Sequence, residues 1–420
     1  MILPTAGILQ LFLIASASSA IIPYRRPSLL PPSSSSRINN SITTTTTTTT
    51  PTPTTLPLII WHGLGDDFTR DGLQQLANMA ETINPGTYVH VIRLGDTAST
   101  DREATFLGNL TTQLEDVCTQ LSTDPILSSA PAVNALGFSQ GGLFLRAYVQ
   151  KCNIPPVHNL VTFGSPHNGI AEFFDCNDDD SLLSGGPSEW ICRTSLALLR
   201  FGRWSDFVQS RLVPAQYFRD PNDSHDLDVY RLKSNFLADI NHERIHYDNH
   251  INDIENDDDD DENCNHKKHT TTTTTTSTTT PQHQHQHQNK TITPNTKNLS
   301  TLNRFVMYMF EDDNTILPKE SSWFAEVNST TGHITPLIDR PIYKQDWIGL
   351  KRLGEEGKLI FRSTPGEHMQ LSDSLLGDTF REFFGPVDFT STSRVDGGEI
   401  GVQQFGHGDN GDIVVQNGMI

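Results

Sequence analysis

The pentapeptide Gly137-Phe138-Ser139-Gln140-Gly141 constrains the fold of this chain more than any other segment. It follows a short apolar run, 133–138, and precedes a run with helical spacing, 143–151. A serine between two glycines at a strand-to-helix turn is typical of a nucleophile elbow, because the turn is too tight for side chains at the flanking positions. The strain in such a turn lifts the hydroxyl clear of the backbone. We therefore predict that Ser139 is a nucleophile at the carboxyl end of a strand.

Short apolar runs of the kind that form buried strands recur along the chain and alternate with helical patterns. The runs are 58–61, 89–94, 133–138, 160–163, 305–310 and 358–361. Strands that alternate with helices predict a mainly parallel sheet covered by helices on both faces. The predicted fold class is therefore α/β.

A serine nucleophile needs a base, and in folds with this turn an acid and then a histidine follow the serine along the chain. The run 305–310 leads into Asp312 and Asp313, and the run 358–361 is followed by His368. Both positions lie just past the carboxyl ends of predicted strands, where open α/β sheets place their sites. Position alone leaves the choice between Asp312 and Asp313 open, and a surface loop is the simpler interpretation of His368 taken by itself.

The glycine-rich segment His62-Gly63-Leu64-Gly65-Asp66 follows the first predicted strand. Backbone N–H groups in such a turn approach a reacting carbonyl closely. The predicted oxyanion donors are the N–H of Leu64 and the N–H of Gln140, the residue after the nucleophile. An ordinary tight turn is an equally good interpretation of the segment 62–66.

Five separate motifs resemble those of the palmitoyl-protein thioesterases, which have the α/β-hydrolase fold. The segments are 58–66, 136–142, 235–241, 322–324 and 366–372, and the resemblance runs from about residue 56 to residue 385. The sequence departs from the vertebrate-like pattern at Asp67-Phe68, where that pattern has a vicinal cysteine pair.

The resemblance implies Ser139 as nucleophile, His368 as base and Asp313 as the acid, because the family's acid lies five residues before the proline that matches Pro318. It also implies the disulfides Cys118–Cys152 and Cys176–Cys192. The resemblance further implies that the stretch 173–236, in which apolar residues are scattered, forms a cap over the sheet, and that this cap holds a fatty acyl chain. The same apolar residues are equally suited to packing the cap on the sheet.

Composition divides the chain into segments. Residues 1–20 are predicted to be a signal peptide, 21–55 a disordered Ser/Thr/Pro-rich linker, 56–385 the catalytic domain and 386–420 a disordered tail. A polar tract at about 248–300 interrupts the domain as an insertion. It carries His283, His285 and His287, which we interpret as low-complexity sequence and not as a metal site.

Sequons and cysteines both fit the secretory pathway. The candidate glycosylation sites within the domain are Asn109, Asn222 and Asn328. In an oxidising compartment the four cysteines of the globular part would form two disulfides, with three possible connectivities before any resemblance is considered. The expected location is a lysosome, a vacuole or the extracellular space.

The formal net charge of −20 argues against phosphate-rich partners such as nucleic acids. No later segment is long and apolar enough to span a membrane, and no cofactor or metal is expected. The predicted function is hydrolysis of the thioester between a fatty acyl group and cysteine in S-acylated proteins or peptides. The alternatives are a lipase or carboxylesterase acting on oxygen esters, and a non-catalytic secreted glycoprotein, against which the complete set of Ser139, Asp313 and His368 argues.

Overall fold

A computed structural model describes residues 54–173, 199–200, 202–247 and 299–388, together with two short strands at 405–407 and 413–415. The predicted signal peptide, nearly all of the predicted linker and insertion, and the histidines at 283, 285 and 287 lie outside the described residues. Cys176 and Cys192 also lie outside them. The segment limits predicted for these parts therefore stay predictions.

Six parallel strands form the central sheet, in the order β2-β1-β3-β4-β5-β8. Their bounds are β1 (Leu58–Trp61), β2 (Val89–Val91), β3 (Val133–Phe138), β4 (Val157–Phe163), β5 (Arg304–Phe310) and β8 (Leu359–Thr364). Two antiparallel pairs lie outside this sheet: β6 (Glu326–Val327) with β7 (Ile334–Thr335), and β9 (Phe405–His407) with β10 (Ile413–Val415). The order and direction of the six strands confirm the predicted α/β-hydrolase fold.

Each of the six predicted apolar runs contributes to a strand of the central sheet, although some bounds differ. The β2 strand ends at Val91, before the predicted limit, because the chain then turns so that the N–H of Leu94 donates to the carboxylate of Asp101 (2.6 Å). The β4 strand begins at Val157, before the predicted run. A search for apolar runs misses its first half because that half contains polar residues.

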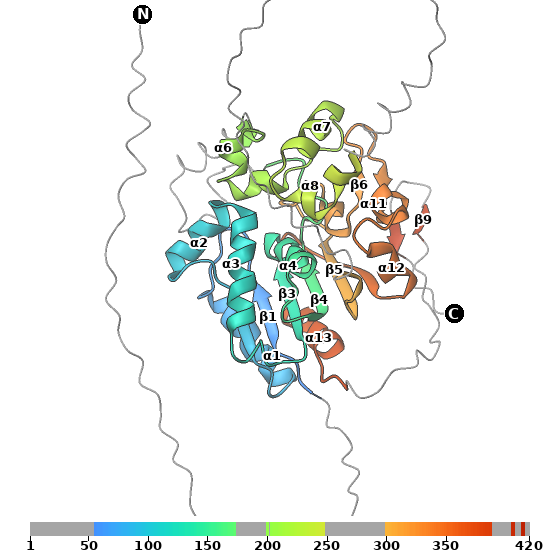
Figure 1. Ribbon diagram of the computed structural model, residues 1–420. Coiled ribbons are helices and arrows are strands. Elements are labelled where there is room, and N and C mark those ends of the chain that lie inside the picture. Colours follow the sequence, from blue (N-terminus) through green and yellow to red (C-terminus); the bar gives the residue numbers. More distant parts are fainter. Residues whose placement is uncertain are drawn as a thin grey trace, which may run out of the picture. The chain divides into compact units, whose positions relative to one another are not determined.

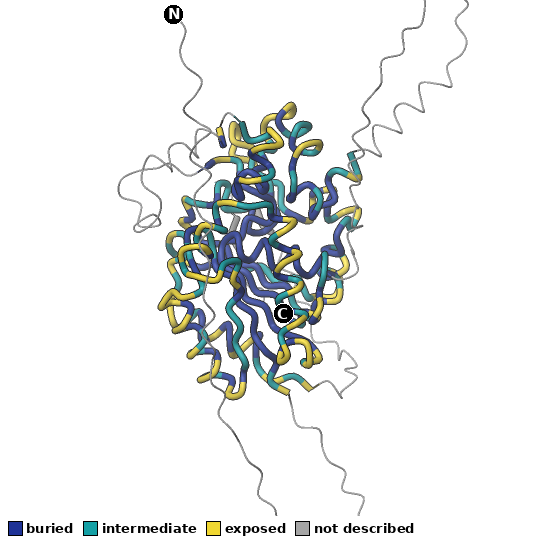
Figure 2. Tube along the Cα trace, turned by 60° about the vertical axis from the view of Figure 1, so that its left-hand side comes forward, coloured by how far each residue is buried: buried dark blue, intermediate teal, exposed yellow. Residues whose placement is uncertain are grey.

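Helices cover both faces of the sheet (Figure 1). On one face α1 (Asp71–Ile83) and α13 (Asp373–Phe383) contact each other and pack on Leu58, Ile60 and Leu136. On the other face α3 (Leu110–Thr123) and α4 (Gln140–Lys151) pack on the alternate strand residues. Figure 2 shows the strands as a buried layer between more exposed helices. Strands buried on both faces explain the continuous apolar runs in the sequence.

The remaining helical segments are short. They are α2 (Ala98–Phe106), α6 (Asp206–Gln209), η2 (Val213–Tyr217), α7 (Ser224–Lys233), α8 (Leu237–Ile240), η3 (Lys319–Trp323), η4 (Leu337–Asp339), α11 (Pro341–Lys344) and α12 (Leu350–Glu355). Those from α6 to α7 belong to the predicted cap, residues 173–236, between β4 and β5. Within the described part of the cap, Val208, Leu212 and Val213 are buried in the core cluster that includes α3 and α4, so these residues pack the cap on the domain.

The predicted disulfide Cys118–Cys152 is present and joins α3 to the end of α4, with the two Cα atoms 6.0 Å apart. It links two helices of the same layer across 34 residues of sequence. The pair Cys176–Cys192 stays a prediction, because both residues lie outside the described residues.

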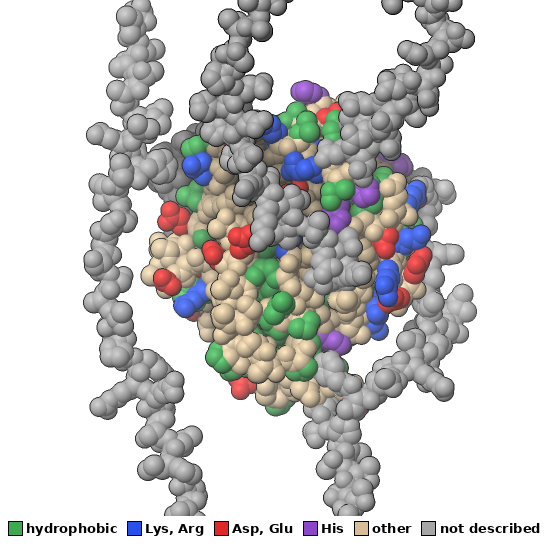
Figure 3. Space-filling view, viewed as in Figure 1, with side chains coloured by type: hydrophobic (Ala, Val, Ile, Leu, Met, Phe, Trp, Pro, Cys, Tyr) green, Lys and Arg blue, Asp and Glu red, His purple; other side chains and the backbone are tan. Residues whose placement is uncertain are grey.

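Charged side chains of both signs are interspersed on the face shown in Figure 3, without a basic area of the kind that binds a phosphate backbone. None of the helices in the described part of the chain combines the length and the apolar character that crossing a bilayer requires.

Candidate active site

Ser139 occupies a strained turn between β3 and α4. Its backbone has φ 51° and ψ −128°, in a region that non-glycine residues rarely adopt. A Cβ on Gly137 would lie 2.3 Å from the Cα of Gly142, and a Cβ on Gly141 would lie 2.3 Å from the carbonyl oxygen of Trp61. Side chains are therefore impossible at both positions, as the pentapeptide predicts.

His368 lies between the serine and a carboxylate. Its Nε2 is 3.0 Å from Ser139 Oγ, and its Nδ1 is 2.7 Å from Asp313 Oδ2. The three side chains come from the loops that follow β3, β8 and β5, so strands of one parallel sheet deliver them to the same edge of the sheet. The structure thus brings together the three residues that the sequence points to.

The environment of Asp313 separates it from Asp312, which position alone could not do. Asp313 is buried, and its Oδ1 accepts from the N–H groups of Thr315 and Ile316, both at 2.9 Å. Those two bonds leave Oδ2 directed at His368. Asp312 is exposed, and its N–H donates to the carbonyl of Gly366 (3.1 Å) in the histidine loop.

The two predicted oxyanion residues lie near the serine, one in the loop after β1 and one directly after Ser139. The loop after β1 passes so close that a Cβ on Gly63 would lie 3.1 Å from the Cβ of Ser139, and Gln140 opens α4. Among the described residues, the backbone N–H groups of Leu64 and Gln140 have no hydrogen-bond acceptor. The N–H of Gln140 lies in the first turn of α4, where N–H groups lack intrahelical partners, and the N–H of Leu64 lies in a loop, so both are free to donate to a substrate oxygen.

A cavity of about 540 Å³ opens beside Ser139 and His368. About half of its apolar lining comes from α1, α13 and the histidine loop, including Leu73, Leu76, Met79, Leu371 and Leu376. The described part of the cap contributes Tyr217. The sequence predicts an acyl site under the cap, of which residues 174–198 lie outside the described residues. The α1 and α13 side of this cavity was not predicted, and its signal in the sequence is the apolar face of two amphipathic helices.

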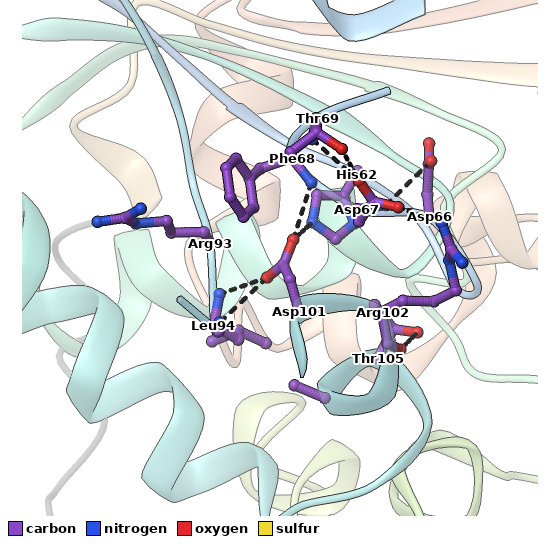
Figure 4. Close-up of polar contacts among 12 residues, drawn as sticks. His62, Asp66, Asp67, Phe68, Thr69, Arg93, Leu94, Asp101, Arg102 and Thr105 are labelled. Carbon is purple, nitrogen blue, oxygen red and sulfur yellow. Dashed lines mark hydrogen bonds and ion pairs between the residues drawn. The ribbon is translucent and has the colours of Figure 1, made fainter. Parts of the chain in front are cut away.

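Sequence reasoning also missed a second buried histidine–carboxylate pair, His62 with Asp101 (Nε2 to Oδ2, 2.9 Å), shown in Figure 4. Burial by itself would lower the pKa of His62, but the hydrogen bond and charge of Asp101 outweigh it and hold that pKa above 6.5. Burial would likewise raise the pKa of Asp101, but bonds from His62 and from backbone N–H groups hold it below 3.8. The pair is therefore ionic at mildly acidic pH, between 3.8 and 6.5.

The candidate glycosylation sites lie at the surface. Asn222 and Asn328 are exposed, and Asn109 is half-buried at the start of α3, where its Oδ1 caps the helix by accepting from the N–H groups of Thr111 and Thr112. Glycosylation at all three positions stays a prediction.

The family model described as "Palmitoyl protein thioesterase" matches residues 57–368 of this chain. Palmitoyl-protein thioesterase 1 of Caenorhabditis elegans is 31% identical over 333 residues, which is 78% of this chain and 92% of the relative. A palmitoyl-protein thioesterase-dolichyl pyrophosphate phosphatase fusion of Schizosaccharomyces pombe is 32% identical over 317 residues, 75% of this chain and 41% of that protein. Lysosomal thioesterase PPT2 of Rattus norvegicus is 26% identical over 307 residues, 72% of this chain and 78% of the relative.

Replacing each aspartate in turn should distinguish the catalytic role of Asp313 from that of its neighbour Asp312. Asp313→Asn removes the charge that holds the His368 tautomer, and we expect kcat to fall by about 10³-fold or more. Asp312→Asn is the matched control and should change kcat by less than about twofold, because that side chain is exposed. Equal losses in the two variants, measured by steady-state hydrolysis, would contradict the assignment of Asp313.

Replacing His62 should alter the dependence of stability on pH. The His62 pKa is raised on folding, so its contribution is complete below pH 6.5 and is lost as the pH rises through the raised pKa. At the acid end the contribution of Asp101 is lost only below 3.8. We expect His62→Gln to lower the unfolding free energy by about 3 kcal/mol at pH 5, and by clearly less at pH 9. A gap between the two proteins that does not change with pH would refute the ionic pair.

Proposed function

The chain belongs to the palmitoyl protein thioesterase family, and on that premise we propose that it hydrolyses the thioester between a long-chain fatty acyl group and a cysteine of an S-acylated protein or peptide. The observation that carries the proposal is the hydrogen-bonded series Ser139–His368–Asp313, of which Ser139 and His368 line a largely apolar cavity. The cavity supplies a place for the chain, and the series supplies the chemistry.

In the first step, His368 Nε2 takes the proton of Ser139 Oγ as the oxygen attacks the thioester carbonyl. Asp313 Oδ2 accepts from Nδ1–H and stabilises the imidazolium that forms. The N–H groups of Leu64 and Gln140 donate to the carbonyl oxygen as it becomes negative. The C–S bond then breaks, cysteine leaves with the proton from His368, and the acyl group remains on Ser139.

In the second step, water replaces cysteine. His368 takes a proton from the water as its oxygen attacks the acyl-serine ester, and the same two N–H groups hold the second oxyanion. The C–O bond to Ser139 breaks, and His368 returns the proton to Oγ. The products are a free fatty acid and the starting enzyme.

The side chains of the cavity support an acyl substrate. Leu73, Leu76 and Met79 lie on one face of α1 and span about 9 Å at 1.5 Å per residue. Each CH₂ group that leaves water for such a surface gains about 0.8 kcal/mol, so chain length should raise affinity stepwise. Asp66, Arg70 and Asp373 also line the cavity and provide its charged groups.

We place the protein in the secretory pathway, with a lysosome, a vacuole or the extracellular space as destination. The disulfide Cys118–Cys152 supports an oxidising compartment, and one relative bears the name lysosomal thioesterase. In this proposal residues 1–20 are a cleaved signal peptide and residues 56–385 form the catalytic domain.

The proposal is tested by incubating the purified protein with a palmitoyl-cysteine peptide and with an oxygen ester of the same acyl chain. We expect release of palmitate from the thioester, and Ser139→Ala should reduce kcat by at least about 10³-fold while the melting temperature stays within a few degrees. Turnover of the oxygen ester alone would indicate a lipase or carboxylesterase, and full activity of Ser139→Ala would reject the nucleophile.

A further inference from the structure

Helix α2 holds the loop that carries Leu64. The carboxylate of Asp101 is completely buried and accepts from the backbone N–H groups of Phe68 (2.8 Å) and Leu94 (2.6 Å), in addition to its contact with His62. Figure 4 shows these contacts converging on Asp101 from the loops after β1 and β2. One end of the Leu64 loop is therefore fixed to α2 through His62.

Thr105 lies one turn further along α2 and holds the same loop at Gly65. Its hydroxyl donates to the carbonyl of Arg102 (2.7 Å) and accepts from the N–H of Gly65 (2.9 Å). Because a hydroxyl has a single proton, the bond to Arg102 leaves a lone pair for Gly65. The Leu64–Gly65 peptide plane, which follows directly on the Leu64 N–H, is thereby held in one orientation.

Thr105 also contacts the second predicted oxyanion residue. Its carbonyl accepts from Gln140 Nε2 (3.2 Å), and Gln140 Oε1 accepts from the hydroxyl of Tyr217 (3.1 Å). All three residues are buried, with exposed fractions of 4% or less. Bonds in such a setting are costly to lose, because an unpaired buried group has no water to replace its partner.

We propose that Thr105 is a positioning residue that sets the geometry of the oxyanion hole by holding Leu64–Gly65 through its hydroxyl and Gln140 through its carbonyl. The inference rests on the proposed function, since it assumes that the N–H groups of Leu64 and Gln140 receive the oxyanion. A residue that does not contact the substrate can still lower the rate strongly if its loss displaces these donors by about 1 Å.

Thr379 is the matched control within the chain. It is also a buried threonine on a helix, and its hydroxyl donates to the carbonyl of Leu375 (2.8 Å), as that of Thr105 does to Arg102. Its hydroxyl contacts Tyr308 and no residue of the loop after β1. If the hydroxyl of Thr105 has only a structural role, replacing Thr105 and replacing Thr379 should therefore have similar effects on the enzyme.

The experiment compares Thr105→Val, Thr105→Ser and Thr379→Val by kcat and KM on a palmitoyl thioester and on a 4-nitrophenyl acyl ester. We expect Thr105→Val to lower kcat by about tenfold or more, with KM within about twofold, because the loss falls on the transition state. Thr105→Ser keeps the hydroxyl and should stay within about threefold of the parent, and Thr379→Val should match the parent in kcat.

A second measurement separates positioning from folding. A long-chain trifluoromethyl ketone, which forms a tetrahedral adduct with the serine, should bind Thr105→Val more weakly by the same factor as kcat/KM falls, whereas affinity for the fatty acid should be unchanged. If the valine variant does not fold, Thr105→Ala against Thr105→Ser makes the same comparison.

Equal kcat values for Thr105→Val and Thr379→Val, or unchanged affinity for the ketone, would overturn the proposal. The two substrates keep this result distinct from a failure of the proposed function. If the parent enzyme cleaves only the oxygen ester, the thioesterase proposal fails, but the ester and the ketone still decide the role of Thr105.

Discussion

The backbone of Ser139, held at a positive φ between a strand and a helix, is the constraint on which the rest of the structure depends. Such a conformation costs roughly 1–3 kcal/mol and persists only where the surroundings enforce it. Here the N–H of Ser139 donates to the carbonyl of Phe163 on the next strand (2.8 Å), and the backbones of Trp61 and Gly142 press against the flanking glycines. The parallel sheet therefore both forces the turn and delivers the loops that surround it.

Two buried histidine–carboxylate pairs flank this turn and differ in what the second ring nitrogen contacts. In each pair the aspartate also accepts from backbone N–H groups, which fixes the direction of the carboxylate. His368 turns its free nitrogen to Ser139, whereas Nδ1 of His62 lies 3.2 Å from the carbonyl of Gly63. A histidine–aspartate pair alone therefore does not identify a base, and the contact with the serine hydroxyl does.

Local patterns predicted the elements that carry the chemistry, because strand burial and the tight turn leave direct marks in the sequence. The run 133–138 coincides with β3, and the glycines at 137 and 141 are required by contacts that the pentapeptide implies. Asp312 and Asp313 differ in burial and in hydrogen-bond partners, both of which depend on the fold, so family resemblance was needed to choose between them in the sequence. The roles of Asp101 and Thr105 left no signal in the sequence. Their partners His62 and Gly65 lie about 40 residues away, and α2, which carries both residues, has the polar composition of a surface helix.

The most direct test of a two-step acyl transfer is to look for the acyl-enzyme. The protein would be mixed with a palmitoyl thioester, quenched in acid within milliseconds to seconds, digested and analysed by mass spectrometry. We expect a palmitoyl group on the peptide that contains Ser139, appearing before free fatty acid accumulates. Turnover with no acylated peptide, or with the acyl group on another residue, would contradict it.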